Sequence, residues 1–175
     1  APGTLRDGML FYFSSSIGFI IAIMLQMGIF SRAVLLAGTA DVVLLFLAAW
    51  SLHQRQKYSW ILVVIFGLIV SAISASPVLL LLIVYLTIFL AAMRLQTGFW
   101  QSPLLSMFLL VFFGTFLEHG LYILGLFVQG VSLSIGESFS QILLPSVLLN
   151  MLLTIPVHAL VQEIFRNLAP MRTEI

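Results

Sequence analysis

The sequence predicts an all-α membrane protein with six transmembrane helices. Hydrophobic residues make up 62% of its 175 residues and charged residues only 7%, a composition that a water-soluble fold of this length cannot bury. The apolar residues form long runs, each close to or above the roughly 17 to 25 residues that cross a bilayer. Because these runs are apolar on every side, they do not fit the alternating strands of an outer-membrane barrel.

Six runs define the expected helices. They are Met9 to Phe30, Ala33 to Leu52, Ser59 to Ala75, Val78 to Met93, Leu104 to Val128 and Ile142 to Ile164. The first run exceeds the apolar region of a signal peptide, about 7 to 15 residues, and is assigned as the first helix. Since the connections between runs are short, residues 1–175 are expected to form a single transmembrane domain.

The basic residues predict how the helices are oriented. If the N-terminus is cytoplasmic, the basic residues on the inner side are Arg6, Arg55, Lys57, Arg94, Arg166 and Arg172. Only Arg32 then lies outside, a six-to-one split that follows the positive-inside rule. Both termini are therefore expected in the cytoplasm, with the protein in a bacterial inner membrane or its equivalent. The longest outer loop is Gln129 to Ser140, which is expected to contain at most a short interfacial helix.

Small residues recur every four positions in two of the runs. They are Ser14, Gly18 and Ala22 in the first, and Gly67, Ser71 and Ala75 in the third. This spacing lets the backbones of membrane helices approach closely. Packing within the bundle is the first interpretation, and a docking face for another protein's helix is the alternative.

The last run carries polar residues at helical spacing. Every fourth residue is polar: Ser146, Asn150, Thr154, His158, Gln162 and Arg166. Residues four apart share one face of a helix, so this polar ladder is expected to face away from lipid. Pro145 lies near the expected start of the helix, whereas Pro156 lies inside it and frees the carbonyl of Leu152, which predicts a kink that shapes the bundle.

Two carboxyl groups fall within other runs. Asp41 belongs to the second, and Glu118 belongs to the fifth, where it precedes His119. Counted from the expected outer ends of their helices, Asp41, Glu118 and Asn150 lie roughly 12 to 15 Å deep, which predicts one polar layer. Two interpretations stay open: a pocket or partner-binding patch that opens outward, and an internal hydrogen-bond network. His158 lies in the inner half, where a structural donor role is expected.

The sequence offers little support for catalysis. It contains no Gly-rich phosphate loop, no HExxH and no nucleophile elbow, and its three histidines lack metal-ligand spacing. It has no cysteine, and its basic residues are too scattered to bind nucleic acid. No catalytic residue, cofactor or metal site is therefore expected.

At this point the residues resemble a known family. The relevant features are an Asp followed by "VVLLFLAAW", then "FGLIVSAISASPVLLL", a Glu in the fifth run and the closing "LLPSVLLNMLLTIPVHALV". Together they resemble the MreD family of rod-shape-determining membrane proteins. The most specific match is Pro145, Asn150 and Pro156 in the last helix. The chain departs from the family in having Ala40-Asp41 where Pro-Asp is common, and in lacking an acidic residue before the Ser-rich turn after the third helix.

The resemblance implies a non-enzymatic scaffold of the cell-elongation machinery. Such a protein binds MreC, acts through it on peptidoglycan synthesis by RodA and a class B penicillin-binding protein, and is expected to connect to MreB filaments. The resemblance also implies a bundle similar to the S components of energy-coupling-factor transporters. The alternative function is therefore that of an S component, which captures a vitamin in an outward pocket. A lipid-processing enzyme is the third class and has the least support.

Overall fold

The computed structural model of the chain describes residues 5–30, 32, 34–35, 37–54, 58–74, 77–96, 102–131 and 134–168. Its elements are α1 (Leu5–Leu25), a π-helical segment (Gln26–Phe30), β1 (Val34–Leu35), β2 (Gly38–Thr39), α2 (Val42–His53), α3 (Ser59–Ser74), α4 (Val78–Gln96), α5 (Pro103–Val128), α6 (Ile135–Ser138), a second π-helical segment (Phe139–Leu143) and α7 (Leu144–Leu168). Arg55, Lys57, Ala75 and Arg172, used in the predictions above, lie outside the described residues.

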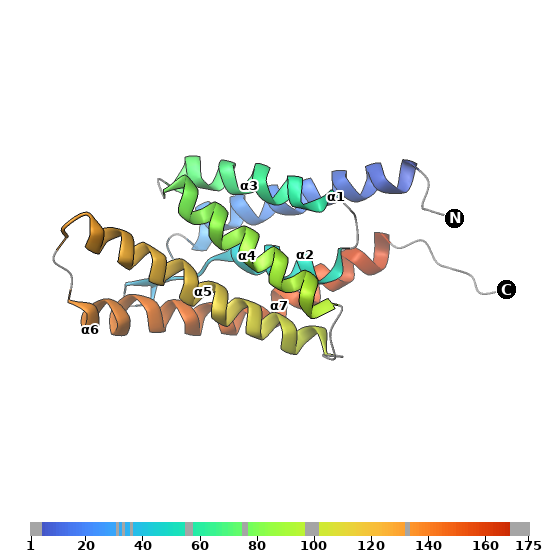
Figure 1. The fold of residues 1–175 in the computed structure, drawn as a ribbon. Helices are drawn as coiled ribbons and strands as arrows, with labels where there is room; N and C mark the ends of the chain where they lie inside the picture. Colours follow the sequence, from blue (N-terminus) through green and yellow to red (C-terminus); the bar gives the residue numbers. More distant parts are fainter. Residues whose placement is uncertain are drawn as a thin grey trace.

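The helices run back and forth in one bundle. The N-terminal end of α1 and the C-terminal end of α7 lie at the same end, and the β-hairpin lies at the other (Figure 1). Arg94 and Arg166 belong to the last turns of α4 and α7 at the first end, whereas Arg32 precedes the hairpin. The described arginines are thus divided between the two ends as the sequence predicts.

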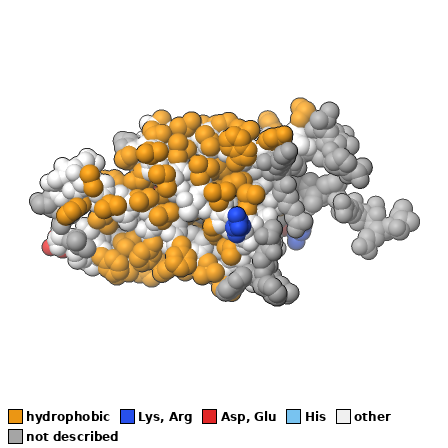
Figure 2. All heavy atoms as spheres, in the orientation of Figure 1, with side chains coloured by type: hydrophobic (Ala, Val, Ile, Leu, Met, Phe, Trp, Pro, Cys, Tyr) orange, Lys and Arg blue, Asp and Glu red, His pale blue; other side chains and the backbone are white. Residues whose placement is uncertain are grey.

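The helical membrane character is confirmed, but six full-length spans are not. Four helical stretches are long and apolar enough to cross a membrane: Gly8–Phe30, Val78–Gln96, Pro103–Val128 and Gly136–Arg166. The helices α2 and α3 have only 12 and 16 residues. Hydrophobic side chains cover most of the visible flank of the bundle, as expected for a surface in contact with lipid (Figure 2).

The prediction for the second helix is wrong in its first part. A helix was expected from Ala33, but the structure places an antiparallel hairpin there, in which Val34 pairs with Thr39. Helix α2 begins only after Asp41, whose Oδ1 accepts a hydrogen bond from Leu44 N at 2.9 Å. Asp is among the preferred N-cap residues, so the sequence did contain a start signal within this apolar run.

Helix α2 forms the centre of the bundle. Its residues from Val42 to Ser51 are all buried, and it packs against α1, α4, α5 and α7. Its C-terminal end is also covered by protein, because Gln96 Nε2 donates to the carbonyls of Ser51 at 2.5 Å and Gln54 at 3.1 Å. A helix that is hydrophobic all round is buried, here within protein rather than in lipid.

Helical structure at the C-terminal end of the chain begins earlier than predicted, at Ile135 rather than Ile142. Helix α5 ends at Val128, followed by Gly130 with a φ of 81°, a left-handed conformation that glycine readily adopts at a helix end. Helical structure resumes at Ile135, inside the expected loop, and continues through both prolines to Leu168. Helix α7 itself begins at Leu144, so Pro145 lies near its start as predicted, but α6 and the second π-helical segment lead into it without a break.

The small residues of the first and third helices pack inside the bundle. A Cβ atom added at Gly18 would collide with the ring of Phe46 on α2, and one at Gly67 would lie 2.9 Å from Leu82 Cδ2 on α4. Ala22 and Ser71 are buried. At these positions the structure thus supports packing within the bundle.

Candidate functional site

The central feature of the site is a short non-helical segment, residues 37–41, that lies against α7. Non-helical backbone at membrane depth is tolerated only where protein or water satisfies its polar groups. Three side chains do so here: Ser146 Oγ accepts from Thr39 N at 3.1 Å, Asn150 Oδ1 accepts from Asp41 N at 2.8 Å, and Gln26 Nε2 donates to Ala40 O at 2.9 Å. We call residues 37–41 with Gln26, Ser146 and Asn150 the joint.

Gln26 contributes both ends of its amide. Its Nε2 donates to the carbonyl of Ala40 at 2.9 Å, and its Oε1 accepts from Val42 N at 2.6 Å. The second bond satisfies one of the backbone N–H groups that the first turn of a helix leaves unpaired. The end of α1 is in this way tied to the start of α2.

Asn150 is completely buried and also uses both ends of its amide. In addition to accepting from Asp41 N, it donates through Nδ2 to Thr115 Oγ1 on α5 at 2.9 Å. Thr115 in turn donates to its own helix at Val111 O, at 2.8 Å. A single side chain of α7 thus connects the joint to α5.

Pro145 and Gly38 explain how the hairpin approaches α7 so closely. Pro145 has no N–H, so the carbonyl of Gln141 lacks its usual helical donor and instead accepts from Ala37 N at 3.0 Å. The π-helical segment ends at the same place, where Leu144 N bonds Phe139 O. A Cβ atom added at Gly38 would lie 2.6 Å from Ser146 N and 2.8 Å from Ile142 O, so only glycine fits against this backbone.

Asp41 and Glu118 face each other beside the joint. Both side chains line the same small cavity, of about 150 Å³. The predicted grouping of Asp41, Glu118 and Asn150 is therefore present. Asp41, however, lies at the N-terminal end of its helix rather than about eight residues inside it. The depth expected for it rested on the incorrect start of the helix.

The cavity has unpaired polar atoms in its wall. Glu118 Oε2 and the hydroxyl of Tyr85 are buried and have no hydrogen-bond partner in the part of the chain that the structure describes. His119 also lines the cavity, and its Nδ1 lies 3.1 Å from the carbonyl of Thr115. Among the described residues, no group of three or more His, Asp or Glu side chains is placed to hold a metal ion. The cavity is thus rich in hydrogen-bonding groups without having the geometry of a metal centre.

A second, more apolar cavity of about 320 Å³ adjoins the first. The two share four lining residues: Gln26, Val43, Val70 and Ser74. The second cavity is otherwise lined by Ile23 and Met27 from the end of the first helix and by Ile73 from α3. Met27 and Ile73 are exposed, so this cavity reaches the surface between α1 and α3.

The inner part of the polar ladder is arranged differently. Thr154 and His158 are buried like Ser146 and Asn150, whereas Gln162 and Arg166 are exposed. The ring of His158 lies 5.4 Å from that of His53, and its Nδ1 is buried without a partner. His158 therefore does not join the group formed by Asp41, Glu118 and Asn150. Pro156 is exposed on α7, which continues through it as an α-helix.

Three residues of the site were not predicted from the sequence. Thr115 lies three and four residues before Glu118 and His119, so helical spacing would have placed it on the same face. Tyr85 is one of two hydroxyl side chains in an apolar run, and Gln26 is a lone amide near the end of one. A search for isolated polar residues within apolar runs would have found all three.

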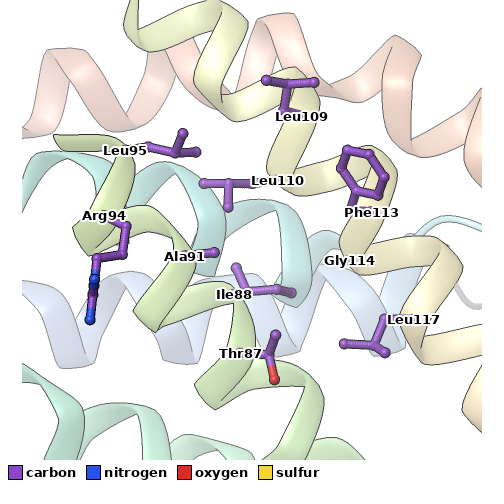
Figure 3. Close-up of a pocket in the computed structure, with 10 residues that line it drawn as sticks. All are labelled: Thr87, Ile88, Ala91, Arg94, Leu95, Leu109, Leu110, Phe113, Gly114 and Leu117. Atoms are coloured by element: carbon purple, nitrogen blue, oxygen red, sulfur yellow. The ribbon is translucent and has the colours of Figure 1, made fainter. Parts of the chain in front are cut away.

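A separate apolar groove of about 420 Å³ lies between α4 and α5. Figure 3 shows its lining side chains, with Ile88 and Ala91 from α4 facing Leu110, Phe113 and Leu117 from α5. Phe113 is 64% exposed, so the groove is open to the surroundings of the bundle. Its chemistry suits another apolar helix or a lipid chain.

No family model, curated protein or solved structure matches this chain. The joint, the two adjoining cavities and the groove are the features that bear on function. The joint connects the start of α2 to α7, the polar cavity presents acidic and hydroxyl groups, and the groove presents an apolar surface. Each suggests a different kind of interaction.

Proposed function

We propose that this chain is a non-enzymatic scaffold of the rod-shape machinery, of the MreD kind, which binds MreC in a bacterial inner membrane. The observation that carries this proposal is the joint. Pro145 and Asn150, two of the three residues of the most specific match, lie on α7 beside a segment that is distant in the sequence. Asn150 Oδ1 accepts from Asp41 N, and Pro145 leaves Gln141 O to accept from Ala37 N. A common structural role at the joint accounts for these two residues and for Asp41.

All six major helices cross the membrane in this proposal, with both chain ends in the cytoplasm. The shortness of α2 is compatible with a crossing because its buried ends are capped by side chains from α4, from α7 and from the π-helical segment that follows α1. The hairpin supplies the remaining length on the outer side. Arg94 and Arg166 then lie on the cytoplasmic side, as the positive-inside rule requires.

The groove between α4 and α5 is the proposed docking site for the single membrane helix of MreC. Helices associate in membranes through close packing, and the groove offers a recessed apolar surface between two helices. Through MreC the chain would influence RodA and its class B penicillin-binding protein, and it would connect to MreB on the cytoplasmic side. In this way it would help to regulate peptidoglycan synthesis without catalysing it.

The test is co-purification of the tagged chain with an MreC protein in mild detergent. Phe113→Ala removes the exposed ring in the groove, while Phe127→Ala removes a ring of equal exposure, 65%, on the same helix but outside the groove. The expected result is a stoichiometric complex that Phe113→Ala weakens several-fold and Phe127→Ala leaves unchanged. Equal recovery of MreC with both variants would rule out the groove, and no complex with the parent chain would rule out the scaffold role.

The second candidate function is that of a substrate-binding S component of an energy-coupling-factor transporter. The observation that favours it is the cavity lined by Asp41, Tyr85 and Glu118, with its open apolar extension. Mass spectrometry of the purified chain distinguishes the two functions. A vitamin retained in stoichiometric amount, together with no binding of MreC, would support the S component.

A further inference from the structure

The polar cavity and its apolar extension together have the form of a site for an amphiphilic ligand. Their volumes, about 150 and about 320 Å³, are within the range of small-molecule pockets when taken together. Because they share Gln26, Val43, Val70 and Ser74, a molecule that entered between α1 and α3 would pass directly from one to the other. We call the pair the double cavity.

The inner end of the double cavity favours a cation. Two carboxyl groups that line one cavity of about 150 Å³, as those of Asp41 and Glu118 do, repel each other unless they share a proton or hold a positive charge between them. None of the described residues lining this end is a lysine or an arginine. An ammonium group would supply the positive charge and several hydrogen-bond donors at once.

Tyr85 provides independent evidence that something binds here. Its side chain is only 1% exposed, it lines the cavity, and its hydroxyl has no partner within the fold. Buried hydroxyl groups nearly always have a hydrogen-bond partner, so an unpaired one in a cavity wall is available to bond a molecule that enters the cavity. Glu118 Oε2 is buried and unpaired in the same wall.

The outer end of the double cavity favours a hydrocarbon chain. Its lining is formed mainly by aliphatic and thioether side chains: Ile23, Met27, Val43, Val70 and Ile73. The inner cavity has room for about five water molecules, at about 30 Å³ each, and so accommodates an ammonium group with a few carbons. The rest of a short chain would then lie in the outer part.

We propose that the double cavity binds a small amphiphilic primary amine, with its ammonium group between Asp41, Glu118 and Tyr85 and its alkyl chain toward Met27 and Ile73. This site is distinct from the groove between α4 and α5. Binding of the amine does not depend on the scaffold role proposed above.

The probe is hexylamine, titrated calorimetrically into the purified full-length chain in detergent at pH 7. The neutral analogue 1-hexanol serves as the control for burial of the chain alone, and detergent without protein serves as the blank. We expect saturable binding of one hexylamine per chain, with 1-hexanol at least about tenfold weaker because it lacks the charge. Equal affinity for the two compounds, or no saturable binding of hexylamine, would overturn the proposal.

Three variants connect the binding to named groups. Glu118→Gln is expected to weaken hexylamine binding about tenfold or more, and Tyr85→Phe about threefold to tenfold, because each removes one acceptor for the ammonium group. Glu137→Gln is the control, since it neutralises an exposed carboxylate at the same end of the bundle. Tyr85→Phe leaves no group of the fold unpaired, so this variant remains informative even if Glu118→Gln fails to fold.

Two further outcomes separate amine binding from the binding of an inorganic cation and from the scaffold role. If sodium chloride displaced hexylamine at millimolar concentration with the same dependence on Glu118, the site would belong to an inorganic cation and the amine proposal would be wrong. If the chain bound hexylamine but did not co-purify with MreC, the scaffold proposal would fail while the amine site would stand. The binding assay contains no partner protein, so the two failures are separable.

Discussion

Asn150 and His158 occupy equivalent positions in the polar ladder of α7, yet the structure uses them differently. Asn150 bonds both the backbone of Asp41 and the side chain of Thr115. His158, eight residues further along, has a buried Nδ1 without a partner and contacts mainly the ring of His53. The difference shows that helical spacing determines which residues face inward, whereas the neighbouring segment determines what they do there.

The neighbouring segment differs because α2 is short. Beside Asn150 the chain is non-helical and has backbone groups to be bonded, while beside His158 it is the last turn of α2, where Trp50 O accepts from Gln54 N and Ser51 O accepts from Gln96 Nε2. In that turn His53 Nδ1 lies 2.8 Å from its own helix at the carbonyl of Ala49. A buried polar side chain is therefore expected to stabilise the fold strongly at the outer position and weakly at the inner one.

The largest loss of unfolding free energy is expected for Asn150→Leu. The change leaves the buried N–H of Asp41 without its acceptor and removes the donor to Thr115 Oγ1, which keeps its bond to Val111 O, and the two losses together cost about 3 kcal/mol of unfolding free energy. Thermal or denaturant unfolding in detergent measures the loss. Leu149→Ile is the matched control on the adjacent residue, and equal stability of the two variants would contradict the role assigned to the joint.

A smaller loss of unfolding free energy, about 2 kcal/mol, is expected for Gly38→Ala. The added methyl group would meet the backbone of Ile142 and Ser146, which cannot move away as a flexible side chain can. The same substitution at Gly136, where nothing lies within 4 Å, is the control. If both alanine variants unfolded at the temperature of the parent chain, the close contact between hairpin and α7 would be disproved.

The smallest change in unfolding free energy is expected for His158→Phe. An aromatic ring is retained beside His53, and the only buried polar atom removed is one that has no partner, so stability should change by less than about 1 kcal/mol. The measurement is the same unfolding experiment. A loss as large as that of Asn150→Leu would show that the two positions are equivalent and would remove the contrast between them.

Much of the bundle follows directly from the sequence. The apolar runs located every major helix, and the fourfold spacing of Ser146, Asn150, Thr154 and His158 predicted a buried face. The approach of Asp41 to Glu118 was also expected. It was reached, however, by counting residues along a helix that in fact begins only after Asp41. The partners Gln26, Tyr85 and Thr115 were not predicted, because each comes from a different helix and its role depends on packing.

The sequence by itself determined that this is a helical membrane protein, since so apolar a chain with so few charges has no other way to satisfy its backbone in lipid. Only the tertiary structure decided where the second helix begins. An apolar run at membrane depth is helical by default, because helical hydrogen bonds are the nearest available. Residues 37–41 leave the helix because side chains of α7 and the end of α1 replace those bonds, and that replacement exists only once the bundle has assembled.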